Sequence, residues 1–85
     1  MYNLLDTIKQ SAQDRKILKI SYLEKDGSND GWRYVEPYSF STDHGEDGLF
    51  AWDVEKDGIR RFSIERISSA EITDQDYTPR YTVEI

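Results

Sequence analysis

Apolar side chains recur at helical spacing in the first part of the chain. Four of them fall on the positions of a single helix face: Leu4, Leu5, Ile8 and Ala12. Asn3 stands where a side chain can cap a first turn, and Asp6 puts a carboxylate where the helix dipole favours one. The pattern predicts one amphipathic helix that ends near Asp14 and packs through its two leucines and Ile8.

Beyond this helix the apolar positions alternate with polar ones, and β-branched and aromatic residues are frequent. Four segments are predicted to be strands: Lys16–Lys25, Trp32–Phe40, Leu49–Glu55 and Ile59–Ile67. A turn at Asp26–Gly31, a polar loop at Ser41–Gly48 and a tight turn at Lys56–Gly58 separate them. Ser69–Thr73 and Arg80–Ile85 could each supply a last short strand.

One helix followed by five or six short strands predicts a mainly β domain, because no second helix is present to cross over a parallel sheet. The antiparallel strands are expected to form a small five-stranded barrel beside the N-terminal helix. Four side chains are expected to be buried in it: Ile20, Val35, Phe62 and Ile64. Eighty-five residues bury too little surface for two cores, so residues 1–85 are expected to be a single domain.

The composition narrows the setting and the partners. The chain has no cysteine, which excludes a disulfide framework or a thiolate metal site and suits the cytoplasm. No window approaches the roughly 18 consecutive apolar residues of a membrane span, and the N-terminus lacks the features of a signal peptide. The formal net charge of −6 argues against coating duplex DNA, which needs many Lys and Arg side chains along an extended face.

The segment Gly58–Ile67 stands out against this acidic background. It holds three of the six arginines, whereas residues 24–57 hold ten acidic residues against three basic ones. Strict alternation puts Arg60 and Arg66 on the face of Phe62, and so at the rims of the barrel. There a guanidinium can offer its planar fork to a phosphate or a carboxylate. The alternative is an internal ion pair with one of three carboxylates: Glu36, Asp53 or Glu65.

Five aromatic side chains could stack on a base or another ring: Tyr22, Trp32, Tyr34, Tyr38 and Trp52. Each such stack contributes about 1 to 3 kcal/mol in nucleic-acid complexes. A domain of this size needs most of its aromatic residues for its core, so packing is the competing interpretation for each of them.

Two patterns that suggest metal or catalytic chemistry fail at their key positions. Residues 26–37 carry Asp, Ser, Asp and Gly at the first, third, fifth and sixth positions of a calcium loop, but Pro37 occupies the twelfth position, where a glutamate belongs. His44 is the only histidine and lies in a polar loop, without the partners of a zinc site or a catalytic triad. We therefore expect no metal, no cofactor and no enzymatic activity.

The order of the segments resembles a known family. A helix is followed by ILKISY, RYVEPY, LFAWD, GIRRFSIERI and DYTPRY, and this order resembles the WYL domain of bacteria and phages over about Leu4–Ile85. The most specific part is the element Arg-x-Phe-x-x-x-Arg-Ile, formed by Arg60, Phe62, Arg66 and Ile67, together with the Glu-Pro-Tyr of the second strand. The Trp-Tyr-Leu triplet of the family's name is absent, and LFAWDV stands in its place.

The resemblance implies an Sm-like (Src-homology-3-type) barrel that senses a negatively charged ligand, with single-stranded nucleic acid or a nucleotide as the leading candidates. Arg60 and Arg66 match the arginines of the family element, while Arg61 sits where the family often has a small hydroxyl residue. The side chains expected at the ligand site are Arg60, Arg61, Arg66, Tyr22, Tyr38 and Trp52.

The resemblance also implies partners, because WYL domains usually follow a helix-turn-helix or winged-helix domain in transcription regulators. Only about fifteen residues precede the first predicted strand. We therefore expect a stand-alone member or a piece of a longer regulator, which acts through an attached or associated helix-turn-helix DNA-binding partner and is compatible with a homodimer. The alternative is an Sm-like interaction or oligomerisation module that pairs edge strands and uses its arginines as internal ion-pair partners.

Overall fold

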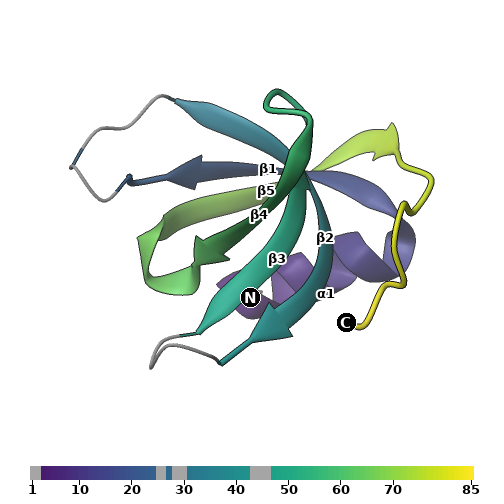
Figure 1. Cartoon of the computed structure of the whole chain (residues 1–85), viewed down its shortest axis with the longest axis horizontal. Helices are drawn as coiled ribbons and strands as arrows, with labels where there is room; N and C mark the ends of the chain where they lie inside the picture. Colours follow the sequence, from purple (N-terminus) through teal and green to yellow (C-terminus); the bar gives the residue numbers. More distant parts are fainter. Residues whose placement is uncertain (1–2, 25–26, 28–30, 43–46) are drawn as a thin grey trace.

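The computed structural model describes residues 3–24, 27, 31–42 and 47–85 (Figure 1). The predicted turn Asp26–Gly31 and the polar loop Ser41–Gly48 lie partly outside these residues. The acidic positions of the calcium-like pattern and His44 lie outside them entirely.

The N-terminal helix forms as predicted. Helix α1 spans Leu4–Asp14, and the side chain of Asn3 caps it by accepting a hydrogen bond from the N–H of Asp6 at 2.8 Å. The helix ends where Arg15 takes a left-handed backbone conformation with φ of 56°. Figure 1 shows α1 lying against one side of the sheet, where it packs on β1, β2 and β5.

The face that α1 buries is narrower than the sequence suggests. Its core-facing residues are Leu4, Ile8, Ser11 and Ala12. Leu5, which was expected in the core, is 40% exposed, because it lies about 100° around the helix from its neighbour Leu4. The buried hydroxyl of Ser11 is satisfied by donating to the main-chain oxygen of Lys16 at 2.6 Å.

Five strands form one antiparallel sheet. They are β1 (Lys16–Tyr22), β2 (Trp32–Ser41), β3 (Gly48–Asp53), β4 (Gly58–Ser63) and β5 (Ile67–Asp76). Their order across the sheet is β4-β3-β2-β1-β5, and every neighbouring pair is antiparallel. The predicted mainly β domain with an N-terminal helix is thereby confirmed.

The predicted strand Ile59–Ile67 is wrong in its second half. Strand β4 ends at Ser63, which pairs with the first residue of β3 and so leaves the chain without a partner strand to follow. A short 3-10 helix, η2 (Ile64–Arg66), then turns the chain toward β5. Ile64, expected to be buried, is therefore only partly buried against the core.

Of the two segments that could supply a last strand, only the first lies in a strand of the structure. Arg80–Ile85 forms no strand, and the last strand is β5, which is longer than the expected Ser69–Thr73. The segment after β5 instead runs without regular structure along β2, where the N–H of Glu84 donates to the main-chain oxygen of Tyr38 at 2.7 Å.

The sheet curls so strongly that β4 meets β1, although two strands separate them in the sheet. The rings of Tyr22 and Phe62 meet edge to face with centroids 5.0 Å apart, and the N–H of Ser63 donates to the Tyr22 hydroxyl at 2.9 Å. Among the described residues no strand ladder joins β4 to β5, so η2 spans the seam of the curled sheet. The curl encloses the core, in which Ile20, Val35 and Phe62 are fully buried as predicted.

Within the described part of the chain, no helix has both the length and the apolar character needed to cross a membrane.

Candidate anion-binding site

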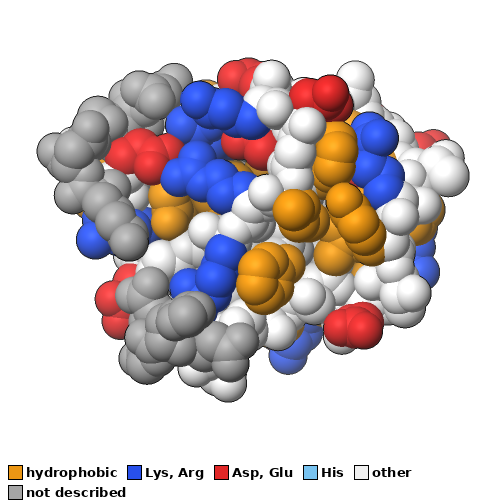
Figure 2. All heavy atoms as spheres, in the orientation of Figure 1, with side chains coloured by type: hydrophobic (Ala, Val, Ile, Leu, Met, Phe, Trp, Pro, Cys, Tyr) orange, Lys and Arg blue, Asp and Glu red, His pale blue; other side chains and the backbone are white. Residues whose placement is uncertain are grey.

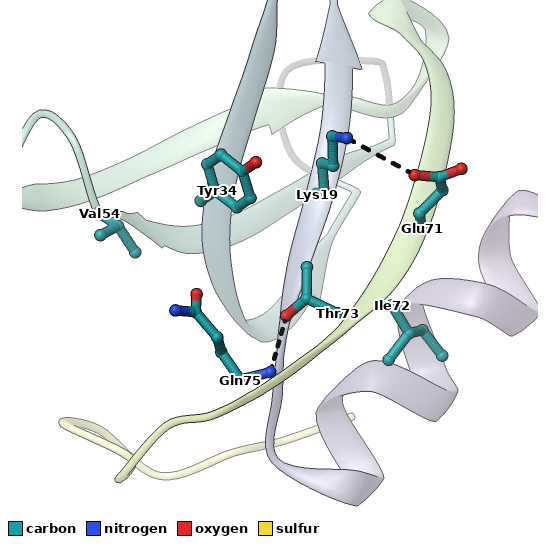
Figure 3. A pocket seen from close by; sticks show the side chains of 7 residues that line it. All are labelled: Lys19, Tyr34, Val54, Glu71, Ile72, Thr73 and Gln75. Atoms are coloured by element: carbon teal, nitrogen blue, oxygen red, sulfur yellow. Dashed lines mark hydrogen bonds and ion pairs between the residues drawn. The ribbon is translucent and has the colours of Figure 1, made fainter.

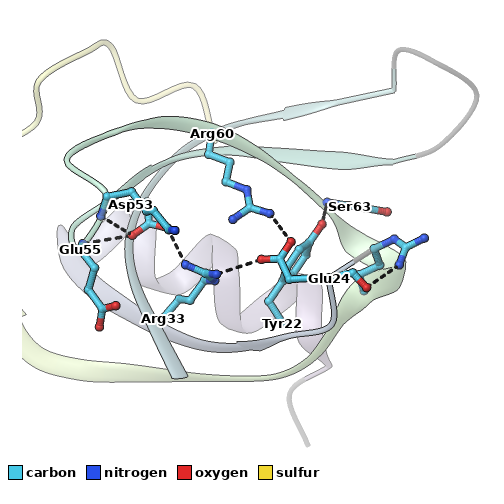
Figure 4. A network of polar contacts seen from close by, with 9 residues as sticks. Tyr22, Glu24, Arg33, Asp53, Glu55, Arg60 and Ser63 are labelled. Atoms are coloured by element: carbon cyan, nitrogen blue, oxygen red, sulfur yellow. Dashed lines mark hydrogen bonds and ion pairs between the residues drawn. The ribbon is translucent and has the colours of Figure 1, made fainter. Parts of the chain in front are cut away.

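Three arginines from different elements converge on Glu24, two residues after β1 (Figure 4). The two carboxylate oxygens of Glu24 pair with different guanidinium groups: Oε1 lies 2.9 Å from Arg33 Nη2, and Oε2 lies 2.7 Å from Arg60 Nη2. The main-chain oxygen of Glu24 accepts a hydrogen bond from Arg66 Nη1 at 3.2 Å. These four residues, Glu24, Arg33, Arg60 and Arg66, are called the arginine cluster below.

Strand alternation and one turn explain how the cluster assembles. On β2, Arg33 shares the inner face of the sheet with the buried Val35, two positions along. On β4, Arg60 shares that inner face with Phe62. Arg66 arrives by a different route from the one predicted, because η2 and not a continuous strand brings it back to the end of β1.

Asp53 holds Arg33 from the other side. Its side chain is fully buried at the end of β3, and its Oδ2 lies 3.3 Å from Arg33 Nη1. Its Oδ1 accepts hydrogen bonds from the main-chain N–H groups of Glu55 and Lys56, both at 3.1 Å. Asp53 therefore fixes both the turn after β3 and a guanidinium that is only 6% exposed.

Arg60 lies on an aromatic floor. Its guanidinium carbon is 4.9 Å from the ring centroid of Phe62 and 5.3 Å from that of Tyr22. A guanidinium above a ring face is attracted by the ring's quadrupole, and its long stem covers apolar surface. These two rings hold the Arg60 guanidinium above the core, and the Arg60 side chain is 32% exposed.

The electrostatics of the cluster are strongly coupled. The hydrogen bond and the charge of Arg60 lower the pKa of the Glu24 carboxyl, against an opposing effect of desolvation. The same hydrogen bond raises the pKa of Arg60. The carboxylates of Glu24 and Asp53 pair with the guanidinium groups of Arg33 and Arg60, and Arg66 bonds a main-chain oxygen.

In the space-filling view, blue side chains gather beside red ones on one side of the visible face (Figure 2). In the cluster, Arg33 pairs with Glu24 and Asp53, and Arg60 pairs with Glu24. The carboxylates predicted as alternative partners did not include Glu24, which pairs with Arg60. Asp53, which was among them, pairs with Arg33.

The structure brings together three of the six predicted site residues and separates the others. Arg60, Arg66 and Tyr22 meet in or under the arginine cluster. Tyr38 and Trp52 lie on the outer face of the sheet, because Trp52 alternates with the buried Asp53 and Tyr38 packs under the C-terminal segment. Arg61 also faces outward, and its guanidinium packs against the backbone of Gly48, where a Cβ would collide with it.

Two members of the cluster, Arg33 and Glu24, were not predicted from the sequence. The signal for Arg33 was present, because a strand in which Val35 faces the core must also turn residue 33 inward. No local pattern marks Glu24, since its role depends on a turn beyond β4 and on the curl of the whole sheet.

Tyr38 and Trp52 belong to a second arginine site. The guanidinium of Arg80 lies 4.3 Å from the ring centroid of Trp52, and its Nε lies 3.2 Å from the Oε1 of Glu36. The Tyr38 hydroxyl donates to Glu36 at 2.8 Å and accepts from the N–H of Arg80 at 2.9 Å, while the ring of Tyr81 packs against both Tyr38 and Trp52. These five residues, Glu36, Tyr38, Trp52, Arg80 and Tyr81, are called the tail clasp below.

Burial of the Tyr38 side chain in the tail clasp raises the pKa of its hydroxyl to about 12. The hydroxyl therefore stays protonated at neutral pH and can donate to the Glu36 carboxylate.

A shallow groove of about 630 Å³ lies elsewhere on the sheet, across β2, β1 and β5 (Figure 3). Its lining residues are Lys19, Tyr34, Val54, Glu71, Ile72, Thr73 and Gln75. The ammonium of Lys19 lies 3.8 Å from the Glu71 carboxylate, so the cation in this groove already has an anionic partner. The groove therefore offers less to an anion than the arginine cluster does.

No group of three or more His, Cys, Asp or Glu side chains among the described residues is arranged to hold a metal ion.

This geometry defines the class of protein. It is a small β domain with an N-terminal helix and with the arginine cluster on the inner face of its sheet. The sequence profile of the WYL domain family matches residues 3–72, which is most of the chain, and the chain therefore belongs to that family. Membership supports a regulatory, ligand-sensing role in transcription in place of a catalytic one.

Among solved structures, the chain is similar to proteasome accessory factor B/C (PafBC) of Arthrobacter aurescens, with a TM-score of 0.76 and 21% sequence identity. The similarity covers 85% of this chain and 11% of that chain, so this domain spans a small part of that protein's length. The likeness shows a shared fold. No curated protein matches the chain.

Proposed function

We propose that this domain senses an anionic ligand, either single-stranded nucleic acid or a nucleotide, at the arginine cluster. The observation that carries the proposal is the convergence of Arg33, Arg60 and Arg66 on a single residue, Glu24. Guanidinium groups supply the planar, charge-assisted donors that phosphate oxygens bind best, and all three of these contact the same residue. In a chain with a net charge of −6, the gathering of three arginines around one residue supports a specific purpose for them.

Arg66 and Arg60 are the side chains proposed to contact the ligand directly. Within the part of the chain that the structure describes, Arg66 bonds a main-chain oxygen and pairs with no carboxylate. Arg60 is partly exposed on its aromatic floor, whereas Arg33 is almost fully buried between Glu24 and Asp53. Arg33 would therefore lie behind the site and reach an anion only where that anion takes the place of the Glu24 carboxylate.

The regulatory step requires two arrangements of the protein that bind the ligand with different affinity, because a ligand shifts an equilibrium only by its differential affinity. We propose that the second arrangement involves an attached or associated helix-turn-helix domain, consistent with family membership. Ligand binding at the arginine cluster would then change how that DNA-binding partner pairs or orients.

A second candidate function is a protein interaction module whose arginines are structural. Two observations favour it: the Arg60–Glu24 pair is internal, and strands β4 and β5 are the edges of the sheet among the described residues. An exposed edge can accept a strand from another chain. This function predicts an oligomeric state that nucleotides and oligonucleotides leave unchanged, together with no binding of anions.

Equilibrium binding to a labelled single-stranded oligonucleotide of about ten nucleotides, a length within the range that small barrels bind, tests the proposal. Arg60→Ala and Arg66→Ala should each weaken binding about tenfold or more, because each removes a charge-assisted hydrogen bond to phosphate. Arg15→Ala removes the same charge far from the cluster, next to the end of α1, and should change the affinity much less. Wild-type affinity in both cluster variants would reject the proposal.

A further inference from the structure

Glu24 holds the place that a ligand anion would take. Each of its two carboxylate oxygens pairs with a different guanidinium, one from β2 and one from β4. Its main-chain oxygen receives the third arginine of the cluster. An anion that bridges Arg33 and Arg60 must therefore displace the Glu24 carboxylate.

Displacing Glu24 is a competition between anions. Glu24 is tethered beside the site, and a tethered competitor acts at an effective concentration on the order of millimolar or above. A ligand group with one negative charge replaces the carboxylate with no gain in charge. A group with a larger charge gains additional attraction to the guanidinium groups, in a partly buried setting that screens charges less than water does.

Phosphates differ in this respect according to their position in a nucleic acid. An internal phosphodiester carries one charge and two free oxygens. A terminal phosphate carries about −1.5 to −2 charges at neutral pH and has three acceptor oxygens. Its third oxygen adds an acceptor to the two that the Glu24 carboxylate offers to Arg33 and Arg60.

We infer that Glu24 is the specificity-determining residue of the cluster and selects ligands with a terminal phosphate over internal phosphodiester groups. The inference rests on the proposed function, because it concerns the same site. Two sources share this chemistry: the 5′-phosphorylated end of a single strand, and a free mononucleotide.

The test compares two oligonucleotides of identical sequence and length, one with a 5′-phosphate and one with a 5′-hydroxyl. The wild-type protein should bind the phosphorylated strand at least about tenfold more tightly, the effect of about one additional charge-assisted hydrogen bond. Glu24→Gln keeps the shape of the side chain and removes its charge, so both strands should bind more tightly and the preference should shrink to less than about threefold. Adenosine monophosphate as a competitor separates the sources: strong competition favours a free nucleotide, and weak competition favours a strand end.

A measurement on the wild-type protein alone covers the case in which Glu24→Gln does not fold. Inorganic phosphate should displace the labelled strand at a much lower concentration than dimethyl phosphate, which is a monoanion like the internal backbone, at matched ionic strength.

The outcomes separate this inference from the proposed function. Equal binding of both strands by the wild-type protein, with binding still lost in Arg60→Ala, would overturn the role of Glu24 and leave the anion site in place. An unchanged preference in a folded Glu24→Gln variant would overturn it too. Failure of the wild-type protein to bind either strand, or either free phosphate, would reject the proposed function and the inference together.

Discussion

Two arginines of this domain have nearly the same surroundings on opposite faces of the sheet. Arg60 lies over the rings of Phe62 and Tyr22 and pairs with Glu24, and Arg80 lies over the ring of Trp52 and pairs with Glu36. Both sites thus combine one carboxylate, one guanidinium and an aromatic surface.

The two sites differ in the number of arginines that meet at the acidic residue. In the tail clasp, Glu36 is 5% exposed and pairs with Arg80, and its other partner is the neutral hydroxyl of Tyr38. In the arginine cluster, one residue receives hydrogen bonds from three arginines. The clasp fastens the C-terminal segment through one arginine, whereas the cluster gathers three arginines from different elements. Several arginines that meet at one residue therefore mark a candidate site better than a single pair of an arginine and a carboxylate does.

The largest effect is expected at the floor of the cluster. Phe62→Ala should lower the free energy of unfolding by about 3 to 5 kcal/mol, because it leaves a cavity in a fully buried position under Arg60. Chemical denaturation measures the loss. Ile59→Ala on the same strand is the matched control. Because Ile59 is 49% exposed, this substitution should change the free energy of unfolding by no more than about 0.5 kcal/mol. Equal costs for the two variants would show that Phe62 is not a core residue.

Within the cluster, the buried and the exposed arginine should differ in their effect on stability. Arg33→Ala should cost about 3 kcal/mol, because it leaves the fully buried Asp53 without its cation. Arg60→Ala should cost about 1 kcal/mol or less, since Arg60 is one-third exposed. Thermal unfolding of both variants measures the difference. A larger loss in Arg60→Ala would assign Arg60 a structural role and support the interaction-module alternative.

At the tail clasp, stability and ligand affinity should separate. Arg80→Ala should cost about 1 to 3 kcal/mol, because Glu36 remains buried with one hydrogen bond fewer. Oligonucleotide affinity should stay within about twofold of the wild-type value, since the clasp lies on the other face of the sheet. A loss of affinity as large as that of Arg66→Ala would remove the distinction between the two sites.

The smallest effect is a pH dependence that belongs to the clasp. The pKa of Tyr38 is raised from 10.0 to about 12, so the folded state holds its proton where the unfolded state releases it. The stability contributed by the protonated hydroxyl is fully present below pH 10 and is lost as the pH rises from 10 toward about 12. Tyr38→Phe should show a shallower loss of stability over that range in alkaline denaturation. Identical profiles for the two proteins would contradict the assigned shift.

The periodicity of the chain predicted the helix, the antiparallel sheet and most of the core, because each of these depends on local spacing. It did not predict η2, since Ile64 continues the alternation and only the end of strand β3 stops the pairing. Strand alternation was predicted to place both Arg60 and Arg66 on the face of Phe62. It does so for Arg60, whereas the 3-10 helix η2 sets the position of Arg66.

The partners of these arginines could not be predicted from the sequence, because they depend on the curl of the sheet. Glu24 and Arg60 are 36 positions apart and meet only when β4 folds over the end of β1. The tail clasp depends on the same long-range geometry, since Arg80 reaches Glu36 from 44 positions away. The sequence also could not show that Tyr22 lies on one face of the sheet and that Tyr38 and Trp52 lie on the other.

The salt dependence of oligonucleotide binding tests the central claim most directly, namely that the arginine cluster neutralises phosphate and the tail clasp does not. For single strands, the logarithm of the affinity falls with the logarithm of the salt concentration by about 0.7 per phosphate neutralised. Arg66→Ala should flatten this slope by about 0.7, and Arg80→Ala should leave it unchanged. Equal slopes for wild type and Arg66→Ala, or an equal flattening in Arg80→Ala, would contradict the claim.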